Sequence, residues 1–208
     1  MINPSFVVVF LLAAVAVLDV LADSLNVLHM RPELPEEFRG IYDPEKYRAS
    51  LHYQRDHARE GALKRAILLG ATIAFLLCGG FNAADLWARS SSSHEIVRGL
   101  LFAGALMALY GALQIPFSAY ETFVIEERYG FNRTTARVFI QDLFKGIALT
   151  AVLGGAVFAA VQWFFIHAGA RAWLYSWLGL TAFQLLLFFL APVVLMPLFN
   201  KFSPLPPG

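Results

Sequence analysis

Cysteine and charge are scarce in this sequence, and each scarcity excludes a class of protein. Cys78 is the single cysteine among 208 residues, so the chain can form neither an internal disulfide nor a cysteine-based zinc site. Only 15% of the residues are charged, against about 25% in an ordinary globular protein. The net charge of +1 gives no electrostatic support for binding nucleic acid, and we expect no such partner.

Apolar residues take the place of the missing charge. They make up 58% of the chain, with a mean hydropathy of +0.60, whereas soluble domains lie near about 45–50% apolar. The excess apolar surface requires membrane lipid as a partner. The N-terminus lacks the basic residues of a signal peptide, since the first Lys or Arg is Arg31, beyond the first apolar run. We therefore expect a retained first transmembrane helix.

The apolar runs predict five membrane-spanning helices, because a span needs about 20 mostly apolar residues. The predicted fold class is an all-α polytopic membrane protein with about five transmembrane helices plus cytoplasmic helical loops. The polar connections 29–65 and 118–145 are the expected loops, and Asp43 is a candidate cap for a helix that begins near Pro44. The expected spans are residues 6–25, 66–87, 97–117, 147–166 and 173–199.

Basic residues are distributed unevenly among the connections. The two long loops hold twelve of the sixteen Lys and Arg residues. The positive-inside rule therefore predicts that the N-terminus lies outside and the C-terminus in the cytoplasm. Trp163, Trp173 and Trp177 cluster where the outer interface is then expected, as an aromatic belt would.

Several polar side chains fall in or near the expected spans, and two interpretations stay open. They could line a hydrophilic chamber or transport path, or the charged ones could be helix-end residues that reach the interface. For the glutamines we favour hydrogen bonds between helices. The residues are Asp19, Asp23, Asn82, Asp85, Arg98, Gln114, Gln162 and Gln184.

Two short patterns resemble functional motifs and fail on spacing. The string from His94 to Arg98 begins like the zinc motif His-Glu-x-x-His, but an arginine stands where the second ligand belongs. Glu126 and Glu127 are adjacent, and adjacent residues of a helix do not face each other. We expect no catalytic or metal-binding residue in either.

A third pattern is a sequon in the second loop. Residues 132–134, Asn-Arg-Thr, match a glycosylation site, but their expected cytoplasmic side excludes that use. We interpret them as a turn in which Asn132 or Thr134 caps a helix over residues 136–144.

Three stretches resemble one family, the CAAX prenyl proteases of type 1. The first reads Phe123-Val-Ile-Glu-Glu-Arg-Tyr-Gly-Phe-Asn-Arg-Thr-Thr135. Residues 139–145, which follow it, also resemble the family. The second is the end of the chain, residues 197–206, and a weaker one is 47–53. The resemblance implies an all-helical integral-membrane zinc metallopeptidase. Such a protein has about seven spans around a water-filled chamber.

The same resemblance implies a reaction that these residues do not carry. In the family, zinc is held by a His-Glu-x-x-His helix after the fifth span and by a later Glu. By the same resemblance, these enzymes remove the three C-terminal residues that follow a prenylated cysteine, and bacterial relatives are quality-control proteases of membrane proteins. No His-Glu-x-x-His occurs in residues 1–208. We expect one N-terminal membrane domain, inactive alone, in a bacterial inner membrane, and either truncated or one part of a split protein.

The resemblance also assigns roles to eight residues. Docking on the missing catalytic domain is expected of Glu126, Glu127, Arg128 and Asn132. The substrate cleft, or a structural junction, is expected at Asn200, Lys201, Phe202 and Pro204. Two other functions stay open, a stand-alone scaffold that binds prenyl groups or lipid, and a small transporter. The absence of an internal repeat argues against the transporter.

Overall fold

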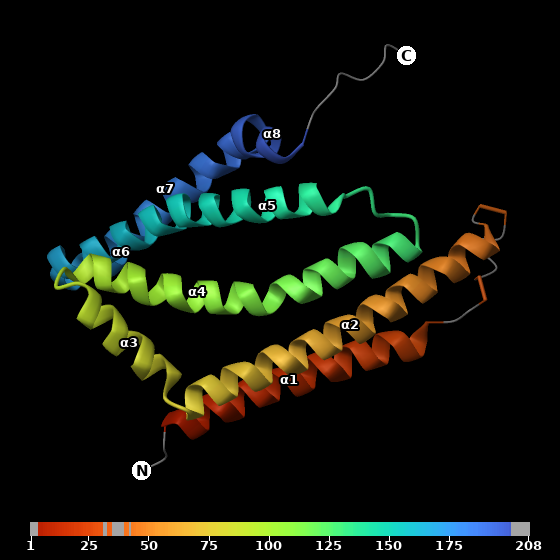
Figure 1. The fold of residues 1–208 in the computed structure, drawn as a ribbon, viewed down its shortest axis with the longest axis horizontal. Coiled ribbons are helices and arrows are strands. Elements are labelled where there is room, and N and C mark those ends of the chain that lie inside the picture. Colours follow the sequence, from red (N-terminus) through yellow and green to blue (C-terminus); the bar gives the residue numbers. More distant parts are fainter. Residues whose placement is uncertain (1–3, 31–32, 35–39, 42, 201–208) are drawn as a thin grey trace. The chain divides into compact units, whose positions relative to one another are not determined.

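The computed structural model describes residues 4–30, 33–34, 40–41 and 43–200, and these form helices and their connections with no β-strand (Figure 1). The helices include short 3-10 and π-helical segments, labelled η. In order they are α1 Pro4–His29, α2 Pro44–Leu77, α3 Gly80–Ser91, α4 Glu95–Tyr120, η2 Glu121–Glu126, α5 Ala136–Leu149, η3 Thr150–Gly154, α6 Gly155–His167, η4 Gly169–Arg171, α7 Ala172–Leu190, η5 Ala191–Leu195 and α8 Met196–Phe199. The predicted all-α fold class is confirmed.

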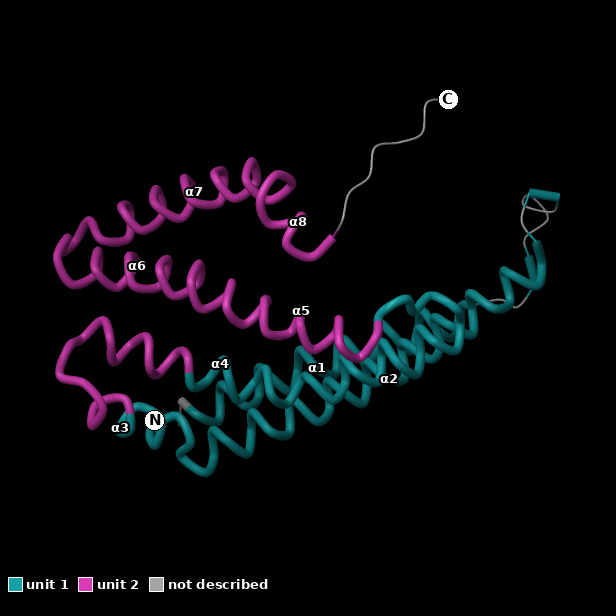
Figure 2. Tube along the Cα trace, turned by 45° about the horizontal axis from the view of Figure 1, so that its top comes forward, with its two compact units in different colours: residues 1–87, 105–134 teal, residues 88–104, 135–208 magenta. Residues whose placement is uncertain are grey.

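The chain divides into two compact units (Figure 2). Unit 1 consists of Met1–Trp87 and Ala105–Thr134, and unit 2 consists of Ala88–Gly104 and Thr135–Gly208. The boundaries between the units fall within α3 and within α4, so each unit contains a part of both helices.

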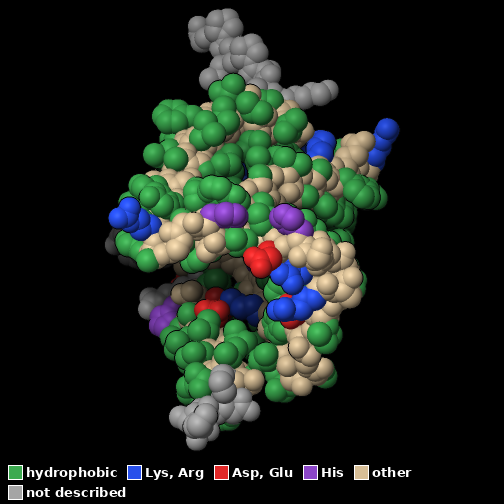
Figure 3. All heavy atoms as spheres, turned by 90° about the vertical axis from the view of Figure 1, so that its left-hand side faces the viewer, with side chains coloured by type: hydrophobic (Ala, Val, Ile, Leu, Met, Phe, Trp, Pro, Cys, Tyr) green, Lys and Arg blue, Asp and Glu red, His purple; other side chains and the backbone are tan. Residues whose placement is uncertain are grey.

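Four helical stretches are long and apolar enough to cross a membrane. They are Ser5–His29, Glu95–Glu126, Ala136–His167 and Gly169–Phe199, and the most apolar part of each is 0% buried within the chain. Figure 3 shows one end of the molecule, on which hydrophobic side chains predominate. A bilayer can cover such surface because every backbone group of a helix is already hydrogen-bonded within the helix. The protein is therefore an integral membrane protein.

The region of the expected span 66–87 is bent rather than straight. Together α2 and α3 are long and apolar enough for one span, but their axes differ by 66°. Gly79 lies between them with φ of 73°, in the left-handed region that glycine enters at little cost. Gly80 supplies room, because a Cβ there would collide with the ring of Phe75. Two adjacent glycines thus allow the bend.

The start of α2 agrees with its predicted cap. Asp43 has extended backbone angles, and its Oδ1 accepts a hydrogen bond from the amide of Glu45 at 2.8 Å. Pro44 occupies the first turn, where its missing N–H costs nothing. The polar first half of this helix lies outside the apolar run that begins at Ala66.

The third span continues beyond its expected end at residue 117. Pro116 lies inside α4, where it cannot donate a backbone hydrogen bond, yet the helix runs on through η2 to Glu126. η2 has the wider π-helical turn, which is often found at functional sites. The polar connection 118–145 therefore begins as a continuation of this helix.

In unit 1, α1 and α2 lie side by side and run in opposite directions (Figure 1). Arg65 of α2 forms an ion pair with Asp23 of α1, and each side chain is about one third exposed. A charge near the apolar region is costly alone and is tolerated when paired. Asp23 is thus engaged with a neighbouring helix.

In unit 2, α6 and α7 form a hairpin joined by η4 (Figure 2). Phe164 contacts Tyr175 across it, with ring centroids 6.1 Å apart. Gln162 of α6 lies against Gly99 of α4, where any Cβ would collide with the glutamine amide. Small residues allow this close approach in membranes. The Oε1 of Gln162 is buried without a hydrogen bond among the described residues, so that atom does not make the predicted interhelical bond.

Replacing Gly79 with alanine tests the bend. We expect Gly79→Ala to lower the free energy of unfolding by about 1–2 kcal/mol, because an L residue is strained at positive φ. The matched control is Gly70→Ala in α2, where a Cβ meets nothing within 4 Å and which should stabilise by about 0.5–1 kcal/mol. Equal effects of the two changes, measured by unfolding in detergent, would contradict this account of the bend.

Candidate functional site

The segment from Glu121 to Thr135 begins with η2, the last part of the helix of the third span, and continues through a turn to the start of α5. Gly130 has φ of 74°, and its amide donates to the carbonyl of Glu127 at 3.1 Å. The amides of Phe131 and Asn132 both donate to the carbonyl of Glu126, at 2.9 and 3.2 Å. A left-handed glycine after a helix allows such bonds to the last carbonyls. The turn is therefore fixed by its own backbone.

Asp56 of α2 holds this turn from the side. The Tyr129 hydroxyl and Nη1 of Arg128 both donate to Oδ2 of Asp56, each at 2.8 Å. Asp56 is 22% exposed and Arg128 57% exposed. Since an exposed ion pair contributes only about 0–1 kcal/mol, the bond from Tyr129 is the stronger contribution. We call Asp56, Arg128 and Tyr129 the Asp56 clamp.

The pKa values of Asp56 and Tyr129 are shifted in the directions that favour their hydrogen bond. The bond from Tyr129 lowers the pKa of Asp56 below its usual value, although burial opposes this, and Arg128 adds to the lowering. Burial, then the bond to Asp56, raises the pKa of the Tyr129 phenol. At neutral pH Asp56 is therefore ionised and Tyr129 protonated.

Aromatic rings and a second polar pair extend the contact between α2 and η2. Tyr53 packs edge-on against His57, Tyr129 and Phe131, with ring centroids 4.3, 5.3 and 5.1 Å apart. Nδ1 of His57 lies 3.5 Å from Oε1 of Glu121. Edge-to-face pairs stabilise by about 0.5–1.5 kcal/mol each beyond the area they bury. The start of η2 and the turn after it are thus anchored on one face of α2.

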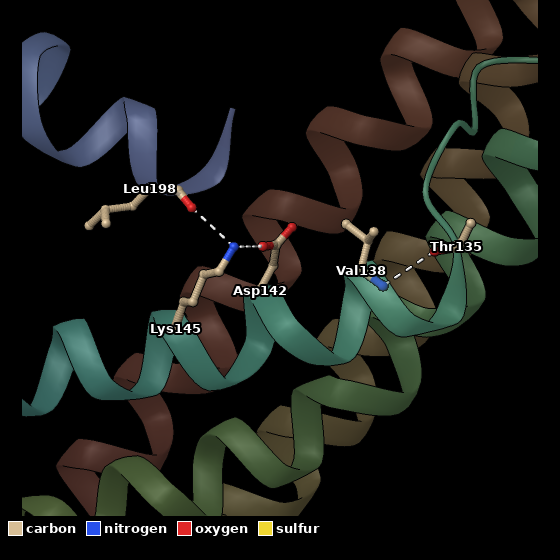
Figure 4. Close-up of polar contacts among 5 residues, drawn as sticks. All are labelled: Thr135, Val138, Asp142, Lys145 and Leu198. Carbon is tan, nitrogen blue, oxygen red and sulfur yellow. Dashed lines mark hydrogen bonds and ion pairs between the residues drawn. The ribbon is translucent and has the colours of Figure 1, made fainter. Parts of the chain in front are cut away.

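The turn after the clamp leads directly into α5. Asn132 donates from Nδ2 to Glu127 at 3.0 Å, and its Oδ1 accepts from the amide of Thr134 at 2.6 Å. The cap of α5 is Thr135, whose hydroxyl accepts from the amide of Val138 at 3.3 Å (Figure 4). The prediction that Asn132 or Thr134 is the cap is therefore wrong, because Asn132 forms the preceding turn instead.

The structure brings four of the predicted site residues together. Glu126, Glu127, Arg128 and Asn132 lie within one helix end and its turn, and three of them use their side chains in contacts within unit 1. Asn200 follows α8, and its amide donates to the carbonyl of Met196 at 2.9 Å. Lys201, Phe202 and Pro204 lie outside the described residues. Docking and cleft roles stay predictions.

Sequence reasoning missed the α2 side of this site. Its members recur at helical spacing, three and four residues apart, which places them on one face. That periodicity was a signal available in the sequence. The residues of η2 and its turn that pack against this face, however, lie more than sixty positions away in the chain. The missed residues are Tyr53, Asp56 and His57.

A metal site is not formed by the described residues. Among them, no group of three or more His, Cys, Asp or Glu side chains is arranged to hold a metal ion. A structural or catalytic zinc needs three or four such ligands. The residues described do not fit zinc, and we assign no reaction step to it here.

Comparison with known proteins identifies the family. The model of the CAAX prenyl protease N-terminal region, described as five membrane helices, matches residues 24–201. The chain belongs to this family. Its resemblance to the CAAX prenyl proteases, noted from the sequence, is confirmed.

Individual relatives agree with the family match. The CAAX prenyl protease 1 homolog of rice is 33% identical over 85% of this chain and 43% of its own length. CAAX prenyl protease 1 of Saccharomyces cerevisiae is 28% identical over 85% of this chain and 41% of its length. The crystal structure of S. mikatae Ste24p superposes with a TM-score of 0.89 at 25% identity, over 100% of this chain and 50% of that one.

The coverage of these matches limits what they show. The chain spans less than half the length of the relatives it matches. It is therefore similar to the N-terminal membrane part of these proteins, and the activity of the whole protein has to be proposed rather than read from the match.

A double-mutant cycle tests the Asp56 clamp. Asp56→Ala and Tyr129→Phe should each destabilise by about 1–3 kcal/mol, because each leaves a polar partner unpaired. Together they should cost less than the sum, with a coupling of about 0.5–3 kcal/mol. Unfolding in detergent or nanodiscs measures this.

The control for the cycle is Tyr120→Phe. Tyr120 is 48% exposed, and no hydrogen bond of its hydroxyl is found in the described part of the chain. Its replacement should change stability by less than about 0.5 kcal/mol. Additive effects of Asp56→Ala and Tyr129→Phe would show that the bond between them contributes nothing.

Proposed function

We propose that this chain is the membrane-embedded N-terminal domain of a CAAX-type zinc metalloendopeptidase. The observation that carries the proposal is the family match over residues 24–201, supported by the TM-score of 0.89 to Ste24p. In the intact protein the reaction is proteolysis of prenylated CAAX proteins or of membrane proteins. The spanning helices form part of the wall of a chamber around the site.

The turn beside α2 is the surface on which the catalytic domain docks. The hydrogen bonds of Gly130, Asn132 and the Asp56 clamp order this turn before any partner arrives. A pre-ordered surface binds with a smaller entropy loss than a flexible one. Glu127 and Arg128 keep exposed charged groups there. Together with Glu126 and Asn132 they form the docking residues of the proposal.

Asn200, Lys201, Phe202 and Pro204 lead from the membrane domain toward the catalytic domain. In this proposal the zinc ligands belong to the catalytic domain. The partners in this proposal are membrane lipid, the catalytic domain and prenylated or membrane-protein substrates.

The orientation of the chain is also part of the proposal. The uneven distribution of Lys and Arg supports an outer N-terminus and a cytoplasmic C-terminus. The docking surface then faces the cytoplasm, where prenylated proteins are found. The relatives named above are eukaryotic, and a bacterial inner membrane stays a prediction from the sequence.

The function is tested on the reading frame beyond Gly208. A longer protein with a His-Glu-x-x-His helix should contain zinc and release three residues from a farnesylated Cys-a-a-X peptide, as measured by mass spectrometry. Replacing the Glu of that motif by Gln should abolish release, and residues 1–208 alone should release nothing.

Two results would remove the proposed function. One is a stop codon at the end of this sequence with no partner subunit, and the other is a longer protein that hydrolyses no such peptide. Saturable binding of the farnesylated peptide by residues 1–208, with no hydrolysis by the longer protein, would favour a prenyl-binding scaffold.

The orientation is tested by labelling introduced cysteines in intact cells. In a Cys78→Ser background, Ser92→Cys should react with a membrane-impermeant maleimide from outside. Arg133→Cys should react only after the membrane is permeabilised. The reverse pattern would contradict the proposed orientation, and Cys78→Ser alone is the control for background labelling.

A further inference from the structure

Lys145 connects the middle of α5 to the end of the last described helix. Its Nζ donates to the carbonyl of Leu198 at 3.0 Å and to Oδ1 of Asp142 at 3.0 Å (Figure 4). The same Nζ lies 5.6 Å from the centre of the Phe199 ring. Both helices belong to unit 2, and the two residues in contact lie 53 positions apart in the chain.

The position of the contact gives it a physical meaning. The carbonyl of Leu198 is one of the last of the helical run 169–199, and such carbonyls have no partner inside their own helix. They also carry the negative end of the helix dipole, so a cation there is favourable. Lys145 thus caps the final helical turn from a different helix.

Asp142 makes this capping geometrically specific. It lies three residues before Lys145, on the adjacent turn of α5, and its carboxylate holds the ammonium beside Leu198. Both residues lie in the long helix Ala136–His167, just before the apolar run that begins at residue 147. The ammonium makes a hydrogen bond to the helix end that an apolar side chain at this position could not make.

We propose that Lys145, aligned by Asp142, is a positioning residue that fixes where the chain leaves the membrane domain after Phe199. Because Lys145 holds Leu198 and Phe199, the last helical turn has a fixed position, and so does the point at Asn200 where the helix ends. This deepens the proposed function, because a protease whose catalytic domain follows Asn200 needs that domain in a defined place. The contact itself does not depend on the proposed function.

Hydrogen exchange on the 208-residue chain in nanodiscs tests the contact. Lys145→Met should speed amide exchange in residues 196–200 by at least about tenfold, because it removes a hydrogen bond with a charged donor. Lys145→Arg, which keeps the charge and the donors, should stay within about threefold of the unchanged chain. Asp142→Asn, which leaves the ammonium in place, should give an intermediate rate.

The control is Lys46→Met, which removes an exposed lysine near the start of α2. It should leave exchange in residues 196–200 unchanged. In Lys145→Met the faster exchange should be confined to α8 and the neighbouring turn of α5, with α6 and α7 as protected as before. Three results would overturn the proposal. Exchange in Lys145→Met could be as slow as in Lys46→Met, or Lys145→Arg could lose as much protection as Lys145→Met. The third is a loss of protection in Lys145→Met that spreads over α7.

A second readout separates this inference from the proposed function. In the longer protein, Lys145→Met should lower kcat for the farnesylated peptide at least about tenfold with KM changed less than about twofold, since positioning acts on the chemical step. Lys145→Arg should restore kcat. Unchanged kcat in Lys145→Met would overturn the positioning role. Absence of activity in every variant would remove the proposed function, and the exchange result would still decide the contact.

Discussion

The hydrocarbon of a bilayer offers no partner for a backbone N–H or C=O, and this constraint governs the chain. Each described span is a helix that bonds its own backbone, and the sequence meets that demand with apolar surface on all sides. Where the helices end or bend, the freed groups need other partners. Glycines at 79 and 130 and the ammonium of Lys145 are found at such points.

The polar segment that follows the third span is the clearest example. Its side chains serve mainly to end one helix, turn the chain and begin the next. Asn132 closes the turn, Thr135 caps α5, and Tyr129 fastens the end of η2 to α2. A sequence this specific is therefore explained first by structure. The same rigidity suits it as a docking surface, which is why both interpretations meet in one place.

Two charged pairs near the spans, one in each unit, each connect two helices. Asp23 and Arg65 pair between helices, and Asp142 and Lys145 pair within one helix while reaching another. In each case the cost of a charge near lipid is offset by a partner that also joins two elements. Such pairs locate helices more specifically than apolar packing can, because their directions are fixed by hydrogen bonds.

Much of the fold was predictable because its signals are local. Long apolar runs gave the spans, Asp43 before a proline gave the start of α2, and the motif around Glu126 and Arg128 gave the family. The bend at Gly79 was not predicted, since a glycine pair in an apolar run also suits a straight helix. The unbroken continuation of α4 into η2 was not predicted, because the change from apolar to polar residues at 118 indicates only where the apolar run ends.

The sequence by itself determined that this protein lies in a membrane, that it is helical, and which family it belongs to. Each of these depends on composition, on periodicity along the chain or on a continuous string of residues. The tertiary structure alone decided that Asp56 accepts a hydrogen bond from Tyr129 and that Lys145 donates one to the carbonyl of Leu198. Those pairs join residues more than fifty positions apart. Their formation depends on how whole helices pack, which no local pattern encodes.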